Sequence, residues 1–358
     1  MSDGLSTSSP LLTVAIPTWN RATYLEQNLA QIRAELAKIA PGLVEVLVSD
    51  NCSTDATPAV VESAIAAGLP IRYVRNETNL GWALNFAQSY DLASGKYLLL
   101  FGDDDMFVDG SLSLLLERLA EKDYGVVCLR PYGFDHDFRQ EYPGSFGREL
   151  LFRDANQFLI TIAQSFTLTS ACVVNKSLLS EVDSRQFTQS ALAAFHFVLR
   201  AALAGDENLF IEKYLIASKR QNSFNYEFAE VFVGEMWSIL DAHVAWGLSR
   251  DTVRIMERDM MLSYYPFYLL DLRLSKRGDL KITFDQFAGR FHGRWLFKYW
   301  LAPIILLPRP LAIIWGGATT IIGRVIDGQL WRGLKFVWSR IRRSIFRRRV
   351  ALGAVGLK

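Results

Sequence analysis

The chain has 358 residues, of which 50% are hydrophobic and 21% are charged. This composition excludes a disordered chain, and the length allows one large domain with an appendage. Three scattered cysteines, Cys52, Cys128 and Cys172, exclude a disulfide framework and favour a reducing compartment. The net charge of +2 is unevenly divided, because residues 290–358 hold 14 of the 39 lysines and arginines but one of the 37 acids. An acidic body with a basic tail predicts two partners of different character.

Residues 12–130 alternate short apolar runs, typical of strands, with stretches of helical periodicity. This order predicts an α/β fold with a mainly parallel sheet and flanking helices, and such sheets bind ligands at the carboxyl ends of their strands. Asn20 is expected to cap the first helix. The expected strands are 12–16, 44–48, 71–74, 96–101 and 126–129, and the expected helices are 21–40, 55–67, 82–93 and 111–120.

The rest of the chain is less regular. A strand is expected at 171–174, a helix at 191–204 and further helices between 227 and 275. The change of composition along the chain predicts three regions. These are a catalytic domain over residues 1–225, a helical extension over 226–294 and an apolar, basic, membrane-associating tail over 295–358.

Three consecutive carboxylates, Asp103, Asp104 and Asp105, follow the expected buried strand 96–101. Adjacent carboxylates repel one another, and burying them raises the folding free energy unless a cation binds there. A divalent metal with oxygen ligands is the usual cation, and such a metal often holds a diphosphate. The run therefore indicates chemistry on a nucleotide-activated substrate.

The strand ends together resemble family 2 glycosyltransferases of the GT-A fold. The resemblance rests on residues 14–21 (VAIPTWNR), 48–55 (VSDNCSTD), 79–85 with Asn79, Gly81 and Asn85, and 93–105 (ASGKYLLLFGDDD). The Gly-Asp-Asp-Asp ending is most similar to the abequosyltransferase-like branch, which adds sugars during bacterial surface-polysaccharide assembly. The tail has no part in the resemblance.

The resemblance implies a nucleotide-sugar site at the strand ends, with Mg²⁺ or Mn²⁺ as cofactor. A metal there offsets the charge that develops on the leaving nucleoside diphosphate. The implied roles are Pro17, Thr18 and Asn20 beside the nucleotide, Asp50 on the base or ribose, Asn79 and Gly81 in the loop beside the nucleotide-sugar, and Asp103, Asp104 and Asp105 on the metal, with Asp103 also binding the donor.

Several of these residues also have a purely structural interpretation. The three aspartates suit a solvated turn, and Asp50 suits a turn in which Ser53 or Asp55 caps the next helix. Asn79 and Gly81 are common turn residues. Four motifs in the same order favour the functional interpretation for the aspartates.

The catalytic base is not assigned by the resemblance. Inverting members of the family carry an acid just before a helix like 194–200, and Ala193 and Ala194 stand there instead. His196 is the nearest group able to accept a proton, although a lone histidine on an apolar helix is also typical of a core residue. Other open candidates are Asp183, Asp135, His136 and Asp137.

The tail indicates membrane association. Residues 296–323 are apolar but interrupted by Lys298, Arg309 and prolines, so the longest clean run is shorter than the roughly 20 residues of a spanning helix. Apolar residues from Trp331 to Ile345 then recur on one helical face among many arginines, which is typical of a helix lying on an anionic membrane. We expect residues 295–350 to bind that surface, and the apolar run disfavours nucleic acid as the partner.

The leading hypothesis is a glycosyltransferase that moves a hexosyl or deoxyhexosyl group from a nucleotide-sugar to a hydroxyl of a lipid-linked saccharide. It would act peripherally on the cytoplasmic face of the inner (plasma) membrane, since no secretory signal begins the sequence. One alternative is a nucleotidyltransferase, which the missing glycine-rich loop after the first strand disfavours. The other is a non-catalytic membrane-associated scaffold, favoured by the absent acid and disfavoured by the three aspartates.

Overall fold

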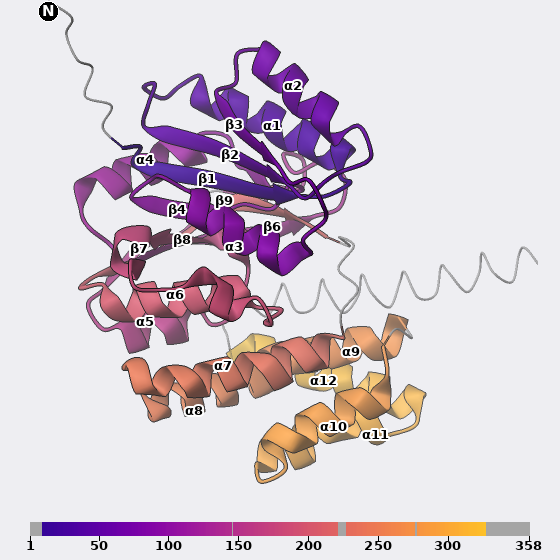
Figure 1. Ribbon diagram of the computed structural model, residues 1–358. Helices are drawn as coiled ribbons and strands as arrows, with labels where there is room; N and C mark the ends of the chain where they lie inside the picture. Colours follow the sequence, from indigo (N-terminus) through magenta and orange to yellow (C-terminus); the bar gives the residue numbers. More distant parts are fainter. Residues whose placement is uncertain (1–8, 145, 221–226, 276–277, 327–358) are drawn as a thin grey trace, which may run out of the picture. The chain divides into compact units, whose positions relative to one another are not determined.

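The computed structural model describes residues 9–144, 146–220, 227–275 and 278–326. These residues form two compact units (Figure 1). The first unit contains the residues up to 224 and Ala242–Leu248, and the second contains 225–241 and the residues from Ser249 onward. Residues 226–294 and 295–326, which the sequence separates into two regions, are thus for the most part in one unit.

The first unit is built on a sheet in the order β3-β2-β1-β4-β8-β6-β9-β5, with β7 paired to β9. The sheet is mixed. Strands β1 to β4 are mutually parallel, whereas β8 runs antiparallel between β4 and β6. The strands are β1 (Leu12–Thr18), β2 (Val44–Asp50), β3 (Ile71–Arg75), β4 (Tyr97–Leu100), β5 (Met106–Phe107), β6 (Val126–Phe134), β7 (Glu149–Phe152), β8 (Cys172–Asn175) and β9 (Asn208–Lys219).

The prediction of a mainly parallel sheet is confirmed in part: β6 and β9 also pair in parallel, whereas β8 and the short strands β5 and β7 pair antiparallel with their neighbours. The apolar run that forms β8 has the same composition as a parallel buried strand, and strand direction depends on the path of the preceding chain. That path contains β7 and a helix, which the irregular pattern after residue 131 did not reveal. The strands and helices expected up to residue 130 are all present, with small shifts of their ends.

The helices of the first unit cover both faces of the sheet (Figure 1). Side chains of α1, α2 and α4 share one apolar core with the even-numbered residues of β1, while α3 and α6 contact strands from the opposite face. The helices are α1 (Ala22–Leu36), α2 (Thr57–Ala66), α3 (Trp82–Leu92), α4 (Ser111–Glu121), α5 (Ala155–Ile162) and α6 (Ala193–Ala204).

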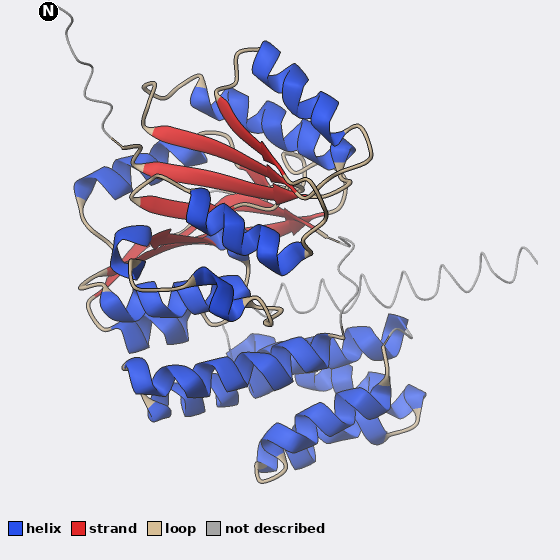
Figure 2. Cartoon of the chain, viewed as in Figure 1, coloured by secondary structure: helices blue, strands red, loops and turns tan. Residues whose placement is uncertain are grey.

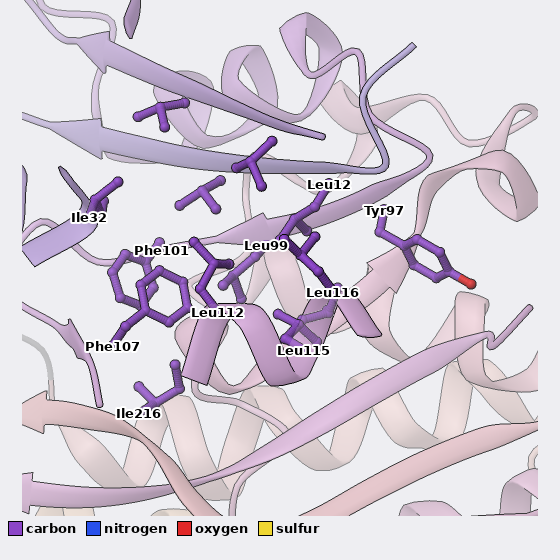
Figure 3. Packing of buried hydrophobic residues seen from close by; sticks show 14 of the residues in the cluster. Leu12, Ile32, Tyr97, Leu99, Phe101, Phe107, Leu112, Leu115, Leu116 and Ile216 are labelled. Carbon is purple, nitrogen blue, oxygen red and sulfur yellow. The ribbon is translucent and has the colours of Figure 1, made fainter. Parts of the chain in front are cut away.

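The core fixes the strand ends in place. Leu12 of β1, Leu99 of β4 and Leu112 of α4 are fully buried in one cluster (Figure 3). Phe101 and Phe107 stack with ring centroids 4.5 Å apart. These two rings flank the aspartate run on both sides in the sequence, so the polar turn at residues 102–105 is anchored in the core at each end.

The second unit is helical throughout its described residues (Figure 2). Its core contains Trp237, whose Nε1 donates to the Tyr265 hydroxyl at 2.8 Å. Its helices are α7 (Met236–His243, which ends at the border with the first unit), α8 (Arg250–Asp259), α9 (Tyr265–Ser275), α10 (Leu280–Phe291), α11 (Ala302–Leu306) and α12 (Arg309–Ile326), with π-helical turns η4 (Glu230–Glu235), η6 (Met260–Tyr264) and η7 (Phe297–Leu301).

In the part of the chain that the structure describes, no helix has both the length and the apolar character needed to cross a bilayer. The amphipathic segment predicted from Trp331 to Ile345 lies outside the described residues.

Candidate functional site

The predicted site residues lie where parallel strands end. Because β1, β2, β3 and β4 are parallel, their carboxyl ends meet at one edge of the sheet (Figure 1). Thr18 and Asp50 are opposite each other in the register of β1 and β2. Asp103 follows β4, which is the neighbour of β1 on the other side. The edge therefore collects polar side chains from four strand ends.

Arg21 joins the loop after β1 to the aspartate run after β4. Its Nε donates to Asp103 Oδ1 at 2.7 Å, and its guanidinium also bonds Asp104. The Thr18 hydroxyl donates to Asp103 Oδ2 at 2.7 Å. Burial raises the pKa of Asp103 to about 6, against the opposing charge of Arg21. The charge of the buried Asp103 carboxylate is thus offset by the guanidinium of Arg21, which follows a different strand.

Asp105 is held by several hydrogen bonds. Its side chain accepts hydrogen bonds from the hydroxyls of Ser170 and Ser218 and from the Lys219 amide. Burial and then the charge of Asp104 raise the pKa of Asp105 to about 7. The backbone of the turn is held by Asn28 of α1, whose Nδ2 donates to the carbonyl of Asp105 at 2.7 Å. The position of the turn is therefore set by α1 and β9.

Two of the three carboxylates in the aspartate turn lie close to Gly102. Among the described residues, no group of three or more His, Cys, Asp or Glu side chains is arranged to hold a metal. However, a methyl group placed on Gly102 would lie 3.0 Å from Asp105 Oδ2 and 3.2 Å from Asp104 Oδ1. Two carboxylate oxygens therefore face the same space beside a glycine, which is a donor set that Mg²⁺ or Mn²⁺ accepts. Asp103 is turned instead toward Thr18 and Arg21.

The loops after β1 and β2 are joined to each other. Asn20 has a left-handed backbone with φ of 53°, and its Oδ1 accepts from the Thr54 amide at 2.7 Å. Its own amide donates to Ser53 Oγ at 2.9 Å. The prediction that Asn20 caps the first helix is wrong, since Asp55 accepts from the first amide of α1, that of Ala22, at 3.0 Å. Pro17 lies half-buried within β1.

Asp50 is fully buried at the end of β2. Its Oδ1 accepts from the Ser53 amide at 2.8 Å, and its Oδ2 accepts from the Tyr73 hydroxyl at 2.7 Å. Arg75 lies 3.5 Å from the same Oδ2. Burial and this carboxylate raise the pKa of the Tyr73 phenol. The contacts that the structure shows for Asp50 thus organise the turn between β2 and α2, and its contact with a nucleotide stays a prediction.

The loop before α3 is built around Asn51 and Asn79. Asn51 Nδ2 donates to Asn79 Oδ1 at 2.8 Å, and that same oxygen accepts from the Gly81 amide at 2.8 Å. Gly81 precedes α3 with φ of +83°, a conformation that glycine adopts with least strain. The loop therefore has a defined shape beside the site, and its role toward a ligand stays a prediction.

Two variants separate the two roles of Asp50. We expect Asp50→Ala to weaken binding of a nucleoside diphosphate by about 1–3 kcal/mol, since a hydrogen bond to a charged group is lost. Tyr73→Phe removes one partner of Asp50 and keeps the carboxylate, so it should lower the free energy of unfolding by about 1 kcal/mol with nucleotide affinity retained. Calorimetry and urea unfolding measure both. If the two variants bound the nucleoside diphosphate equally tightly, Asp50 would only organise the turn between β2 and α2 and would not contact the nucleotide.

His196 lies apart from these contacts, on α6. Its ring stacks on Phe187 with centroids 4.0 Å apart and lies 5.3 Å from the ring of His243. Its Nδ1 is buried without a hydrogen-bond partner. Burial, and then the charge of His243, lower the pKa of His196 to about 4. The surroundings are those of a neutral packed ring, and the role of His196 as base stays a prediction.

The lowered pKa of His196 has a direct consequence for stability. Between about pH 6.5 and about pH 4 the unfolded chain binds a proton at this residue and the folded chain does not, so the free energy of unfolding falls as the pH falls. We expect His196→Phe to remove up to about 3 kcal/mol of this loss. Urea unfolding of both proteins across this range measures the difference. If the two proteins differed in their free energy of unfolding by the same amount at every pH, the buried environment assigned to His196 would be wrong.

The other open candidates for the base have structural partners. Asp183 accepts from the Arg185 amide at 3.0 Å and begins a short helical turn. Asp135 Oδ2 lies 3.1 Å from Arg220. Ala193 and Ala194, where the family carries an acid, are the first two residues of α6. These placements assign the base to none of these residues.

Three residues that hold the site together were missed by the sequence analysis: Arg21, Asn28 and Tyr73. The sequence marked Arg21 only as part of a motif. However, this positively charged residue follows the end of a strand, as the three aspartates do, and that position is a signal for an ion pair. Asn28 interrupts the apolar face of α1 between Leu25 and Leu29, and a polar residue in such a position is a usable signal. Tyr73 carries no signal of its own, because its partner lies 23 residues earlier in the chain.

Comparison of sequences confirms the resemblance that the strand-end motifs indicated. Residues 13–183 match the family described as Glycosyl transferase family 2. Residues 13–183 are thus similar to family 2 glycosyltransferases, and they include the loops after β1, β2 and β4 and the loop before α3, but neither His196 nor β9.

Two curated relatives each match about a third of the chain. Abequosyltransferase RfbV of Salmonella typhimurium is 39% identical over 121 residues, which cover 34% of this chain and 36% of that protein. The GalNAc(5)-diNAcBac-PP-undecaprenol beta-1,3-glucosyltransferase of Campylobacter jejuni is 33% identical over 113 residues, 31% of this chain and 35% of that protein. The match thus spans about a third of each relative, and it supports the abequosyltransferase-like branch.

Two solved structures share the fold over most of the chain. S. aureus TarS 1–349 in complex with UDP-GlcNAc has a TM-score of 0.58 at 18% identity, covering 89% of this chain and 92% of that one. Mannosyltransferase PcManGT from Pyrobaculum calidifontis, in complex with GDP-Man and Mn²⁺, has a TM-score of 0.51 at 18% identity, covering 91% and 88%. At these identities the likeness establishes a GT-A-like α/β fold.

Proposed function

We propose that this protein is a metal-dependent glycosyltransferase that moves a hexosyl or deoxyhexosyl group from a nucleotide-sugar to a hydroxyl of a lipid-linked saccharide. The observation that carries the proposal is the pair of carboxylate oxygens, from Asp104 and Asp105, that face the same space beside Gly102 at the end of β4. The family of residues 13–183 gives the reaction class. The metal complex of a protein with this fold supports Mg²⁺ or Mn²⁺ as the cofactor.

The roles of the chain's own residues follow from their positions. Asp104 and Asp105 would hold the metal, which when bound offsets the negative charge of a leaving nucleoside diphosphate. Arg21 lies between Asp103 and Asp104 and adds a positive charge at the same edge. Thr18 and Asn20 would lie beside the nucleotide from the β1 loop, and Asn79 and Gly81 would lie beside the nucleotide-sugar from the loop before α3. Because these groups are held by hydrogen bonds and ion pairs within the chain, the site is organised before a ligand binds.

The lipid-linked acceptor is supported by the relatives. The name of the Campylobacter jejuni enzyme specifies a saccharide carried on undecaprenyl diphosphate. The Salmonella relative is named as an abequosyltransferase. An acceptor of that class fits a role in surface-polysaccharide assembly, and it fits a chain whose residues from 290 onward are strongly basic. The proposed location is peripheral, on the cytoplasmic face of the inner (plasma) membrane.

The rival functions have less support. A nucleotidyltransferase requires a glycine-rich phosphate-binding loop after β1, and Trp19, Asn20 and Arg21 stand there instead of glycines. A non-catalytic scaffold is favoured by Ala193 and Ala194, which replace the family acid. However, a scaffold has no need for buried aspartates whose charge must be offset, since such groups lower stability.

A transfer assay tests the proposal. The full chain is incubated with Mn²⁺, a panel of nucleotide-sugars and polyprenyl-diphosphate-linked saccharides, and the acceptor mass is measured. We expect one donor to increase the acceptor mass by one sugar and to release its nucleoside diphosphate. A nucleotidyl group on the acceptor, or no product with any donor that the protein binds, would contradict the proposal.

A further inference from the structure

Helix α12 of the second unit has two chemically different faces. The side chains at 311, 314, 315, 318, 322, 325 and 326 are exposed, and they recur at the spacing of one helical face. Every one of them is apolar: Leu311, Ile314, Trp315, Ala318, Ile322, Val325 and Ile326. We call this set the α12 apolar face. In a helix of a water-soluble core the apolar face is the buried one, so α12 has the reverse arrangement.

The opposite face of α12 packs inside the second unit and is made of small residues. Its buried positions are Ala312, Gly316, Thr319, Thr320 and Gly323. A methyl group on Gly323 would lie 2.4 Å from the carbonyl oxygen of Leu262 in η6, so the two backbones are in close contact. This packing requires small residues and fixes the rotation of the helix. The apolar face is therefore held outward by the fold.

The neighbouring segments extend this surface. Trp315 Nε1 donates to the carbonyl of Trp300 in η7 at 3.1 Å, and the adjoining Tyr299 is 70% exposed. Within 295–326 lie nine of the 21 large hydrophobic side chains that are exposed in the described part of the chain. An exposed apolar concentration of this kind marks an interaction surface.

The charge of residues 291–326 indicates what kind of partner this surface binds. No aspartate or glutamate occurs from Phe291 to Ile326, whereas Lys298, Arg309 and Arg324 do, together with Arg294, which pairs with Glu257 at 2.6 Å. Tryptophan and tyrosine accompany these cations, and such amphipathic aromatic rings concentrate at the boundary between water and lipid. The positive charge is complementary to anionic lipid headgroups, and the apolar face suits the acyl region below them.

We propose that the α12 apolar face is a membrane-docking surface that lies in the plane of an anionic lipid leaflet. The proposal rests on the proposed function in one respect, since an acceptor anchored in lipid requires the enzyme at that surface. It assigns apolar insertion to α12 itself, separately from any electrostatic attraction of the basic residues that follow. A second copy of this chain is the competing occupant of the same face.

Vesicle binding by the full chain tests the proposal. The triple variant Ile314→Gln, Ile322→Gln, Val325→Gln changes side chains that are 70%, 45% and 51% exposed. Vesicles of phosphatidylcholine with a minority of phosphatidylglycerol are used at about 1 M salt, where the screening length of about 3 Å suppresses electrostatic binding. We expect the variant to bind these vesicles about tenfold or more weakly than the natural sequence, because less apolar area enters the lipid.

A matched variant serves as the control. Leu43→Gln, Ile65→Gln, Leu151→Gln makes the same kind of change at three exposed sites of the first unit, and its vesicle binding should equal that of the natural sequence. A second readout labels Ala318→Cys with an environment-sensitive fluorophore in a Cys52→Ser background, since Cys128 and Cys172 are buried. We expect a blue shift of emission with vesicles.

The proposal would be overturned if both triple variants bound vesicles equally well. It would also be overturned if vesicles left the fluorophore emission unchanged. A third contrary outcome is a dimer in solution that dissociates only in the α12 variant, while vesicle binding stays unchanged. Nucleoside diphosphate binding by calorimetry should be the same in all variants. If neither the natural sequence nor any variant bound a nucleoside diphosphate, the proposed function would be contradicted. The vesicle measurements would still decide whether the α12 apolar face docks on lipid.

Discussion

Replacing Asp104 by asparagine is expected to lower the turnover number of sugar transfer by about 10²–10³, with the fold retained. The change keeps the shape of the side chain and removes the charge of an oxygen that faces the space beside Gly102. Asp105→Asn should have a similar effect, since its Oδ2 faces the same space. We expect Mn²⁺ affinity, measured by calorimetry with a nucleoside diphosphate present, to fall about tenfold or more in both variants.

Asp109→Asn is the control for this pair. It removes a carboxylate from the same segment, but Asp109 is half exposed and pairs with Arg139 at 2.8 Å. A surface change of this kind alters free energies by about 0.5 kcal/mol or less, so turnover should stay within about twofold. If Asp104→Asn and Asp105→Asn transferred sugar as well as Asp109→Asn and kept their Mn²⁺ affinity, the assignment of the metal ligands would be wrong.

Arg21→Ala is expected to lower the free energy of unfolding by about 3 kcal/mol, because a mostly buried carboxylate loses its cationic partner. The side chains of Arg21 and Asp103 are only 19% and 8% exposed, so water replaces the lost contact poorly. We also expect Mn²⁺ to raise the melting temperature of this variant more than that of the natural sequence, since a bound cation would offset the same charge. Differential scanning calorimetry measures both effects.

Arg33→Ala is the matched change at an exposed position of α1, the helix that begins directly after Arg21. It should alter stability by about 0.5 kcal/mol or less. The double variant Arg21→Ala, Asp103→Asn should recover part of the stability, because it removes the unpaired charge. If Arg21→Ala were as stable as Arg33→Ala, the ion pair between Arg21 and the aspartates would have no role in holding the strand ends together.

The parts of the fold that depend on local pattern were predictable. The elements from β1 to α4, except the two-residue strand β5, follow from apolar periodicity, and the three aspartates lie after the buried strand β4, as the sequence predicted. The antiparallel insertion of β8 between β4 and β6 was not predictable in the same way. Its direction depends on β7 and α5, whose sequences lack a clear period, and on pairing with residues more than 70 positions earlier in the chain.

The internal contacts of the site were predictable only in part. Residue types at strand ends indicated which groups would gather there, but not which would pair. Arg21 and Asp103 are 82 positions apart in the sequence, and the pair depends on β1 and β4 being neighbours. Asn20 shows the converse error: its residue type favours a helix cap, yet its left-handed backbone directs the side chain to the loop after β2.

Nucleotide binding tests the central claim most directly. The melting temperature of the full chain is measured with each common nucleoside diphosphate, in the presence of Mn²⁺ and again with a chelator. A ligand at roughly 100 times its dissociation constant stabilises the folded state by about 2.7 kcal/mol, which corresponds to about 5 °C or more for a domain of this size. We expect one nucleoside diphosphate to produce this shift with Mn²⁺ and a much smaller shift with the chelator. Melting temperatures that no nucleoside diphosphate changes under either condition would contradict the account.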